Sequence, residues 1–287
     1  MKSTGLNNKA IENLAEVKLW YILPSILVIG IVFMMVFTNG HGNNLIEIYI
    51  NAQQDLFFSI NEFLGATPSL QHNLTEFGDV LISFAILSVI FTAAPKFWEA
   101  LITSAILTLF VSAGLKKLFS VPRPAAVFDN DSFTIVGDTL TGHNSLPSGH
   151  SIATFVVIST LTFAFMPKTT GKKIGWILLM LCVGFTLTFS RVAVGAHYPF
   201  DVIIGSMIGV IVAVLGILLN NQINWLKWIS ASKFYPVFIA AFLGMGYGIV
   251  KKLVEDNLFI FYLGLLGLLI AIFLLTKGYL ERNKSQQ

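Results

Sequence analysis

Eight long apolar segments constrain the fold of this chain more than any other feature of its sequence. They cover residues 19–37, 79–95, 98–119, 149–166, 174–190, 201–219, 234–250 and 258–276. A helix of about 20 residues, rising 1.5 Å per residue, crosses the roughly 30 Å hydrocarbon core of a bilayer. Apolar and polar residues do not alternate along the segments, which excludes the strands of a membrane barrel. The sequence therefore predicts an all-α fold, a polytopic bundle of about eight transmembrane helices.

The composition excludes several classes of protein. Hydrophobic residues make up 55% of the chain and charged residues 11%, which is more apolar surface than a soluble domain needs. The net charge of +3 is small and spread over loops, so we expect membrane lipids and not nucleic acid as partners. The single Cys182 lies inside an apolar segment, which excludes an internal disulfide and argues against a thiol active site or a zinc cluster.

The distribution of lysine and arginine predicts the topology, because cytoplasmic loops of membrane proteins carry an excess of both. A polar stretch precedes the first apolar segment and no small-residue cleavage site follows it, so we expect this segment to remain as a transmembrane helix. With the N-terminus in the cytoplasm, twelve of the 18 basic residues lie inside: Lys2, Lys9, Lys18, Lys96, Lys168, Lys172, Lys173, Lys227, Lys233, Lys277, Arg282 and Lys284. Both termini are then cytoplasmic, in a cell or inner membrane, and loops 38–78 and 124–147 lie on the periplasmic or extracellular face.

Three polar motifs stand at the ends of the apolar segments. They read Lys-x6-Arg-Pro (Lys116, Arg123, Pro124), Pro-Ser-Gly-His (Pro147, Ser148, Gly149, His150) and Ser-Arg-x5-His-x3-Asp (Ser190, Arg191, His197, Asp201). The predicted topology brings all three to the outer face. Charged and imidazole side chains are costly in a bilayer, so their gathering on one face indicates a functional site.

These residue types suit phosphoryl transfer, which needs a positioned nucleophile, cations against the phosphoryl oxygens and an acid for the leaving group. A histidine nucleophile must be neutral, with one ring nitrogen bare and the other donating its proton. Asp201 can accept that proton from His197 if the chain turns helically after Pro199. Ser148 and the backbone N–H of Gly149 mark a helix start, a position suited to anions, and glycine lets the backbone approach phosphate.

In order and spacing, the three motifs resemble the signature of the type-2 phosphatidic acid phosphatase family, integral membrane lipid phosphatases related to the vanadium haloperoxidases. The resemblance covers residues 78–220 and implies a six-helix core. It also implies that His197 attacks phosphorus to give a phosphohistidine, which water later hydrolyses, and that His150 protonates the leaving oxygen and then activates the water. The implied phosphate ligands are Lys116, Arg123, Ser148, Gly149 and Arg191.

Neither a metal nor another cofactor is expected at this site. The motifs hold three cationic side chains, which can balance the charge of a phosphate and repel a divalent ion. Their only carboxylate is Asp201, which His197 already requires.

The resemblance suggests a division of the chain at residue 220. Residues 1–220 are predicted to form the phosphatase core, with an N-terminal cytoplasmic segment and an amphipathic outer loop at 39–78; residues 221–287 add a transmembrane hairpin and a polar tail from residue 279. Apolar residues recur at roughly helical spacing within 44–64, so this stretch lies either on the membrane surface or against neighbouring protein. Two glycine groups have the spacing of closely packed helices, Gly205 with Gly209 and Gly244 with Gly246 and Gly248.

The function expected from the resemblance is hydrolysis of a phosphate monoester or pyrophosphate on a lipid. Two alternatives stay open at this point. A phosphotransferase would use the same phosphohistidine and pass the phosphate to an acceptor lipid. A transporter or channel would use membrane charges to line a pathway. Several substrates fit the motifs equally: undecaprenyl pyrophosphate, phosphatidic acid, phosphatidylglycerol phosphate and lipid A phosphate.

Overall fold

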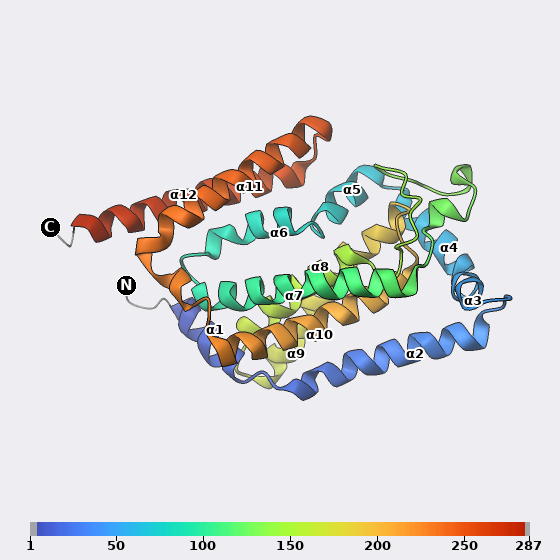
Figure 1. Ribbon diagram of the computed structural model, residues 1–287, viewed down its shortest axis with the longest axis horizontal. Coiled ribbons are helices and arrows are strands. Elements are labelled where there is room, and N and C mark those ends of the chain that lie inside the picture. The colour runs from blue at the N-terminus through green and yellow to red at the C-terminus, as the bar shows by residue number, and fades with distance from the viewer. Residues whose placement is uncertain (1–4, 285–287) are drawn as a thin grey trace.

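Every secondary-structure element in the computed structural model, which describes residues 5–284, is a helix (Figure 1). Over this range there are twelve α-helices, six short 3-10 helices and no strand, which confirms the predicted all-α fold. The α-helices are α1 Gly5–Ala15, α2 Leu23–Asn39, α3 Leu45–Asn51, α4 Gln54–Gly65, α5 Pro68–Glu76, α6 Val80–Leu87, α7 Pro95–Phe119, α8 Gly149–Ala164, α9 Thr170–Ala193, α10 Pro199–Ile223, α11 Tyr235–Glu255 and α12 Phe259–Lys284. Lys2 and residues 285–287, which the sequence interpretation included, lie outside the described range.

Six helical stretches of the described chain are long and apolar enough to cross a membrane. They are Leu19–Asn39, Pro95–Ala126, Thr170–Ala193, Pro199–Ile223, Ser232–Glu255 and Phe259–Arg282. The other two predicted segments are shorter than a full span. Helix α8 has 16 residues, which is about 24 Å of helix. The segment predicted at 79–95 is the eight-residue α6 followed by the 3-10 helix Ser88–Ile90. It meets α5 at a bend of 77°, and only the bent pair together is long and apolar enough to count as a seventh span.

The bend between α5 and α6 has a local cause. The side chain of Asp79 accepts a hydrogen bond from Leu81 N at 2.8 Å, so it begins a new helix instead of continuing α5. Gly78 comes just before it and lies against His150: a Cβ on Gly78 would stand 2.6 Å from the Cβ of His150. Only a residue without a side chain allows this approach, so the bend sets the α5–α6 backbone directly against the first turn of α8.

Helix α10 packs against α8 through glycines. A Cβ on Gly205 would stand 2.7 Å from the carbonyl oxygen of Ser148, and one on Gly209 would stand 2.6 Å from that of Ile152. This confirms the close packing predicted for the pair and fixes the start of α8 against the start of α10.

The second glycine group, in α11, packs closely at only some of its positions. Gly248 approaches Leu81, whereas no atom of the described residues lies within 4 Å of a Cβ on Gly244, so the packing predicted for Gly244 is wrong.

The amphipathic stretch folds over one end of the bundle as α3 and α4, beside α5 and the loop between α7 and α8 (Figure 1). Of the two alternatives for 44–64, packing against the protein is the one observed: Phe57 is fully buried. The packed face is nevertheless more polar than expected. Gln53 and Asn61 are buried on it, while Phe63 is 80% exposed. Polar side chains face inward because they bond to backbone groups near the ends of α9 and α10.

The last two helices form a hairpin beside α6 (Figure 1). Helix α12 packs closely on α6 where Gly267 meets the backbone of Ala85. Helix α12 continues to Lys284, so the predicted polar tail from residue 279 is helical as far as the structure describes it. Helix α1 and the end of α12 lie at the opposite end of the bundle from α3 and α4 (Figure 1).

Candidate active site

His197 lies on the tight turn that joins α9 to α10. Gly195 has a φ of +75°, a left-handed conformation that favours glycine. The carbonyl oxygen of Arg191 accepts hydrogen bonds from Ala196 N at 3.0 Å and His197 N at 3.2 Å, which closes the turn. Pro199 then occupies the first turn of α10, where its missing N–H is not needed. The His197 imidazole is therefore held on a rigid backbone, with only 1% of its surface exposed.

The carboxylate of Asp201 is fully buried next to this histidine and accepts three hydrogen bonds. The donors are the Tyr49 hydroxyl at 2.7 Å, the Ser145 hydroxyl at 2.6 Å and Tyr198 N at 3.0 Å. Oδ2 of Asp201 lies 3.6 Å from Nδ1 of His197. The Ser145 hydroxyl is closer to that nitrogen, at 3.3 Å. The pair expected from the sequence is thus adjacent, and Ser145 joins it as a third member.

The surroundings of His197 favour its neutral form. Burial lowers the pKa of His197 well below its usual range, and the charges of Arg123, Arg191 and Lys116 lower it further. A neutral imidazole keeps a bare nitrogen, which a nucleophile requires. Burial and the charge of Asp201 raise the pKa of Tyr49 well above its usual value, so its hydroxyl keeps the proton that it donates to Asp201.

Two buried arginines lie close to His197, and each is anchored on only part of its guanidinium group. Arg191 donates from Nη1 to the Thr75 hydroxyl at 2.7 Å, while its buried Nε has no hydrogen-bond partner in the described structure. Arg123 donates from Nε to Asn144 Oδ1 at 2.7 Å and from Nη1 to the Ala196 carbonyl at 3.2 Å. Within residues 5–284 neither arginine forms an ion pair with a carboxylate. Their positive charge is therefore available to an anion.

The start of α8 supplies the rest of the predicted site. A Cβ on Gly149 would stand 3.3 Å from Nζ of Lys116, so the glycine leaves room for the lysine. The Ser148 hydroxyl caps α8 and accepts a hydrogen bond from the Ser151 hydroxyl at 2.9 Å, while Ser148 N donates to the carbonyl oxygen of Asp201 at 3.1 Å. Within the described residues the Ser148 hydroxyl acts only as an acceptor, so its own proton can be donated to a ligand. His150 follows on the first turn, beneath Gly78.

Comparison with known proteins identifies the part of the chain that carries these residues. Residues 97–225 match the PAP2 superfamily. The match contains all three motifs, from Lys116 to Asp201, and excludes α1–α6 and the α11–α12 hairpin.

Two individual proteins are similar to parts of this chain. The bacitracin transport permease protein BcrC of Bacillus licheniformis is 43% identical over 70 residues, which are 24% of this chain and 30% of that protein. The crystal structure of Aquifex aeolicus LpxE matches with a TM-score of 0.48 and 23% identity, covering 58% of this chain and 94% of that one.

Several site residues outside the PAP2 match were not predicted from the sequence. Tyr49, Gln53, Phe57 and Asn61 recur every four residues and form the packed face of α3 and α4. Gln53 accepts from Phe200 N at 2.8 Å, and Asn61 donates to the carbonyl oxygens of Val192 at 2.9 Å and Ala193 at 3.1 Å. The four-residue spacing of these side chains could have identified the packed face from the sequence. Thr75 lies near the end of α5, and Asn144 and Ser145, which fall inside the PAP2 match, lie in the polar loop before α8; these three residues carried no comparable signal.

Within the described residues, no group of three or more histidine, cysteine, aspartate or glutamate side chains could hold a metal ion. The side chains that surround His197 are chiefly cationic and hydroxyl groups. This donor set fits a phosphate better than a divalent cation.

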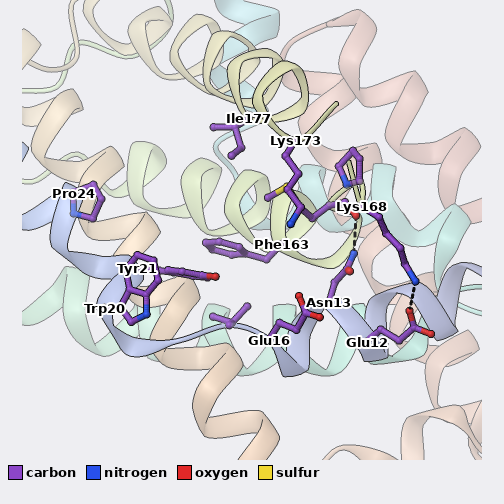
Figure 2. Close-up of a pocket in the computed structure, with 13 residues that line it drawn as sticks. Glu12, Asn13, Glu16, Trp20, Tyr21, Pro24, Phe163, Lys168, Lys173 and Ile177 are labelled. Carbon is purple, nitrogen blue, oxygen red and sulfur yellow. Dashed lines mark hydrogen bonds and ion pairs between the residues drawn. The ribbon is translucent and has the colours of Figure 1, made fainter. Parts of the chain in front are cut away.

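A separate cavity of about 600 Å³ lies at the other end of α8 (Figure 2). It is bounded by α1, the start of α2, the end of α8 and the start of α9. Its wall includes Phe163, which follows His150 by thirteen residues, or about 20 Å along a helix. None of the predicted site residues lines it, so this cavity is distinct from the candidate active site.

Proposed function

We propose that the protein is an integral membrane lipid phosphatase that hydrolyses a phosphate monoester or pyrophosphate on a lipid. The proposal rests on the buried His197 beside Asp201, whose lowered pKa favours the neutral imidazole, and on Arg123 and Arg191, which have no carboxylate partner within residues 5–284. A nucleophile held neutral next to unpaired cations is what phosphoryl transfer requires. The match of residues 97–225 to the PAP2 superfamily supports the same activity.

In the first half-reaction, Nε2 of His197 attacks phosphorus and forms a P–N bond. Burial and the charges of Arg191 and Lys116 lower the pKa of His150, so its ring takes up the proton only when the negative charge of the bound phosphate lies beside it. The bond between phosphorus and the leaving oxygen breaks, and the protonated His150 gives that oxygen its proton. Asp201 and Ser145 hold the proton on Nδ1, so the lone pair stays on Nε2. In the second half-reaction, His150 takes a proton from water, the water oxygen attacks phosphorus, and the P–N bond breaks to release phosphate and regenerate both histidines.

The cations act on the phosphoryl oxygens as charge builds in the transition state. Arg191 presents its unpartnered Nε, and Arg123 presents the part of its fork that Asn144 and Ala196 leave unused. Lys116, Ser148 and the backbone of Gly149 complete the proposed phosphate site. Three positive side chains balance the phosphate without a metal, so we propose that the reaction is metal-independent.

We propose that this site opens to the periplasmic or extracellular face, with both termini in the cytoplasm. The positive-inside distribution of lysine and arginine supports this orientation. We also propose the functional division at residue 220, with the phosphatase core in 1–220 and an added hairpin in 221–287. The substrate is then a phosphorylated lipid of the outer leaflet.

Transport is the second candidate, because the similar Bacillus licheniformis protein is named a transport permease. The match covers only 30% of that protein. Charges that line a transport pathway are expected near the membrane midplane. The charged motif residues Lys116, Arg191 and Asp201 instead lie at helix ends on one side of the bundle. This arrangement favours catalysis over transport.

A phosphate-release assay on purified protein in detergent tests the proposal. The substrates are phosphatidic acid, phosphatidylglycerol phosphate, undecaprenyl pyrophosphate and lipid A phosphate, each with and without an unphosphorylated acceptor lipid. We expect free phosphate from at least one substrate and none from His197→Ala. Phosphate that appears only on the acceptor lipid would identify a phosphotransferase. Protein that releases no phosphate from any substrate, yet moves lipid across liposome membranes, would favour transport.

A further inference from the structure

The α11–α12 hairpin, which lies outside the PAP2 match, is bound to the bend between α5 and α6 by polar contacts. Nζ of Lys252, in the last turn of α11, lies 2.8 Å from Glu76 Oε2 and 2.7 Å from Asp79 Oδ2. At the start of α12, Ile260 N donates to Asn73 Oδ1 at 3.0 Å. The hairpin therefore contacts both sides of the bend at the end of the bundle that carries His197.

The bend in turn supports two residues of the proposed phosphatase site. The hydroxyl of Thr75 accepts the hydrogen bond from Arg191, and Gly78 packs against His150. Glu76 directly follows Thr75, its side chain is only 16% exposed, and its negative charge acts on Arg191. Two cations thus compete for this carboxylate, and Lys252 holds it.

Removing Lys252 would leave a largely buried carboxylate without its partner, which is strongly unfavourable. Arg191, on which the charge of Glu76 already acts, lies on the other side of the bend. A Glu76–Arg191 ion pair would neutralise the guanidinium that the phosphate needs and would block its free edge. On the proposed function, this would weaken phosphate binding while leaving the nucleophile untouched.

We propose that Lys252 is a positioning residue, which holds Glu76 away from Arg191 so that Arg191 stays free to bind phosphate. This rests on the proposed function. It also gives the hairpin a role in the site: the hairpin supplies the cation that keeps the acidic bend from occupying the anion-binding arginine.

The test compares Lys252→Ala with Lys252→Ala combined with Glu76→Gln. We expect the single variant to raise KM and the vanadate inhibition constant about tenfold, which is the effect of losing one such interaction, with a smaller change in kcat. The double variant should return both constants toward wild type, because the competing charge is gone. Lys252→Arg should keep wild-type constants. Lys251→Ala is the matched control, because Lys251 is exposed and lies over the Tyr247 ring instead of the bend.

A double variant no better than Lys252→Ala would overturn the proposal and leave Lys252 a purely structural contact. Unchanged constants in Lys252→Ala would also overturn it. Calorimetric binding of vanadate to each variant provides a readout that needs no turnover. If the wild-type protein released no phosphate, the proposed function would fail, while the vanadate affinities would still decide the role of Lys252.

A second, independent inference concerns the cavity at the opposite end of the bundle (Figure 2). Three aromatic rings follow one another along its wall: Trp20 and Tyr21 have ring centroids 4.5 Å apart, and Tyr21 and Phe163 are stacked at 5.8 Å. Figure 2 shows Glu16 and Lys173 on opposite sides of the space beside the Phe163 ring. Neither forms an ion pair within the described residues, in contrast to Glu12 and Lys168 in the same wall, which lie 3.2 Å apart.

An unpaired carboxylate beside aromatic rings suits an ammonium group, and an unpaired lysine suits a phosphate. Tryptophan and tyrosine are also typical of the level of lipid headgroups. We infer that this cavity binds the headgroup of a zwitterionic phospholipid with a primary ammonium group, its ammonium at Glu16 and its phosphate at Lys173. The site is separate from the active site, so the bound lipid is not the substrate undergoing reaction.

Native mass spectrometry tests this second proposal with the His197→Ala protein, which removes turnover. Dioleoyl phosphatidylethanolamine should remain bound, and dioleoyl phosphatidylglycerol, which lacks the ammonium group, should be retained severalfold less. Combining Glu16→Gln with Lys173→Gln should abolish the difference, whereas Lys172→Gln, an exposed neighbour outside the cavity, should not. Equal retention of the two lipids by the unaltered cavity would overturn the proposal. A protein that binds soluble phosphoethanolamine but does not retain the phospholipid would also overturn it.

Discussion

Nδ1 of His197 lies 3.6 Å from Oδ2 of Asp201, and the hydroxyl of Ser145 reaches both, at 3.3 Å from the nitrogen and 2.6 Å from the oxygen. The 3.6 Å separation is longer than a hydrogen bond. Ser145 is therefore the closer partner of the ring nitrogen. Asp201 acts on His197 through its negative charge and through the hydrogen bond that it accepts from Ser145. The orientation of the proposed nucleophile depends on a loop residue that lies outside all three motifs.

Ser145→Ala should lower kcat about tenfold, since it removes one hydrogen bond worth roughly 1–1.5 kcal/mol from the pair that orients His197. KM should change little, because Ser145 contacts His197 and Asp201 and not the arginines. Tyr49→Phe is the matched comparison: Tyr49 donates to Oδ1, on the other side of the carboxylate, and should cost less activity. Wild-type kcat in Ser145→Ala, or a larger loss in Tyr49→Phe, would contradict this role.

The stability of the protein should fall as the pH falls below about 6.5. Burial lowers the pKa of His197 in the folded protein, whereas the unfolded chain binds a proton near the usual value. The unfolded state therefore binds more protons in this range, so stability present above pH 6.5 is lost toward the lower folded pKa. Thermal unfolding in detergent between pH 7 and 5 measures the effect. His197→Gln should show a shallower decline in Tm, and an equal decline would show that His197 does not cause it.

The orientation predicts which loops meet a reagent that cannot cross the membrane. In a Cys182→Ala background, Asp131→Cys should react with an impermeant thiol reagent in intact cells, and Thr170→Cys should react only after lysis. Asp131 is exposed in the loop that precedes α8, and Thr170 begins α9 at the other end of the bundle. The reverse labelling would put the site in the cytoplasm and require a different pool of lipid.

The reaction should continue after exhaustive chelation with EDTA. Lys116, Arg123 and Arg191 supply the positive charge that a divalent ion would otherwise provide. Vanadate should inhibit, because it adopts the five-coordinate geometry of in-line attack and can bond to His197. Phosphate release after chelation, and then with vanadate added, measures both effects. Activity that disappears with EDTA and returns with Mg²⁺ or Zn²⁺ would contradict this account of the site.

The sequence identified best those site residues whose charged or imidazole side chains are energetically costly in a membrane. His197 and Asp201 stand out because imidazole and carboxylate groups are rare beside apolar segments, and their spacing already implied adjacency. Gly205 and Gly209 similarly indicated close packing of α10, which the contact with α8 confirms. Both signals depend on residues within a few turns of one helix, which is the range over which periodicity can be interpreted.

Features that depend on contacts between distant segments were not predictable in the same way. The apolar run at 79–95 looked like one transmembrane helix, but Asp79 caps a new helix and Gly78 lies against His150, so α5 and α6 bend. The inward face of α4 looked apolar, but Asn61 is buried there because it bonds to the carbonyls at the end of α9. Asp79 acts locally, but the contacts of Gly78 and Asn61 are with residues more than 70 positions away, and local propensity does not record them.

The proposed mechanism depends above all on covalent phosphorylation of His197. The most direct measurement mixes the purified protein with a lipid substrate carrying a labelled phosphate, quenches the reaction in alkali to preserve the P–N bond, and locates the label by peptide mass spectrometry. We predict label on His197, and neither label nor phosphate release in His197→Ala. Label on any other residue, or wild-type turnover in His197→Ala, would contradict the account.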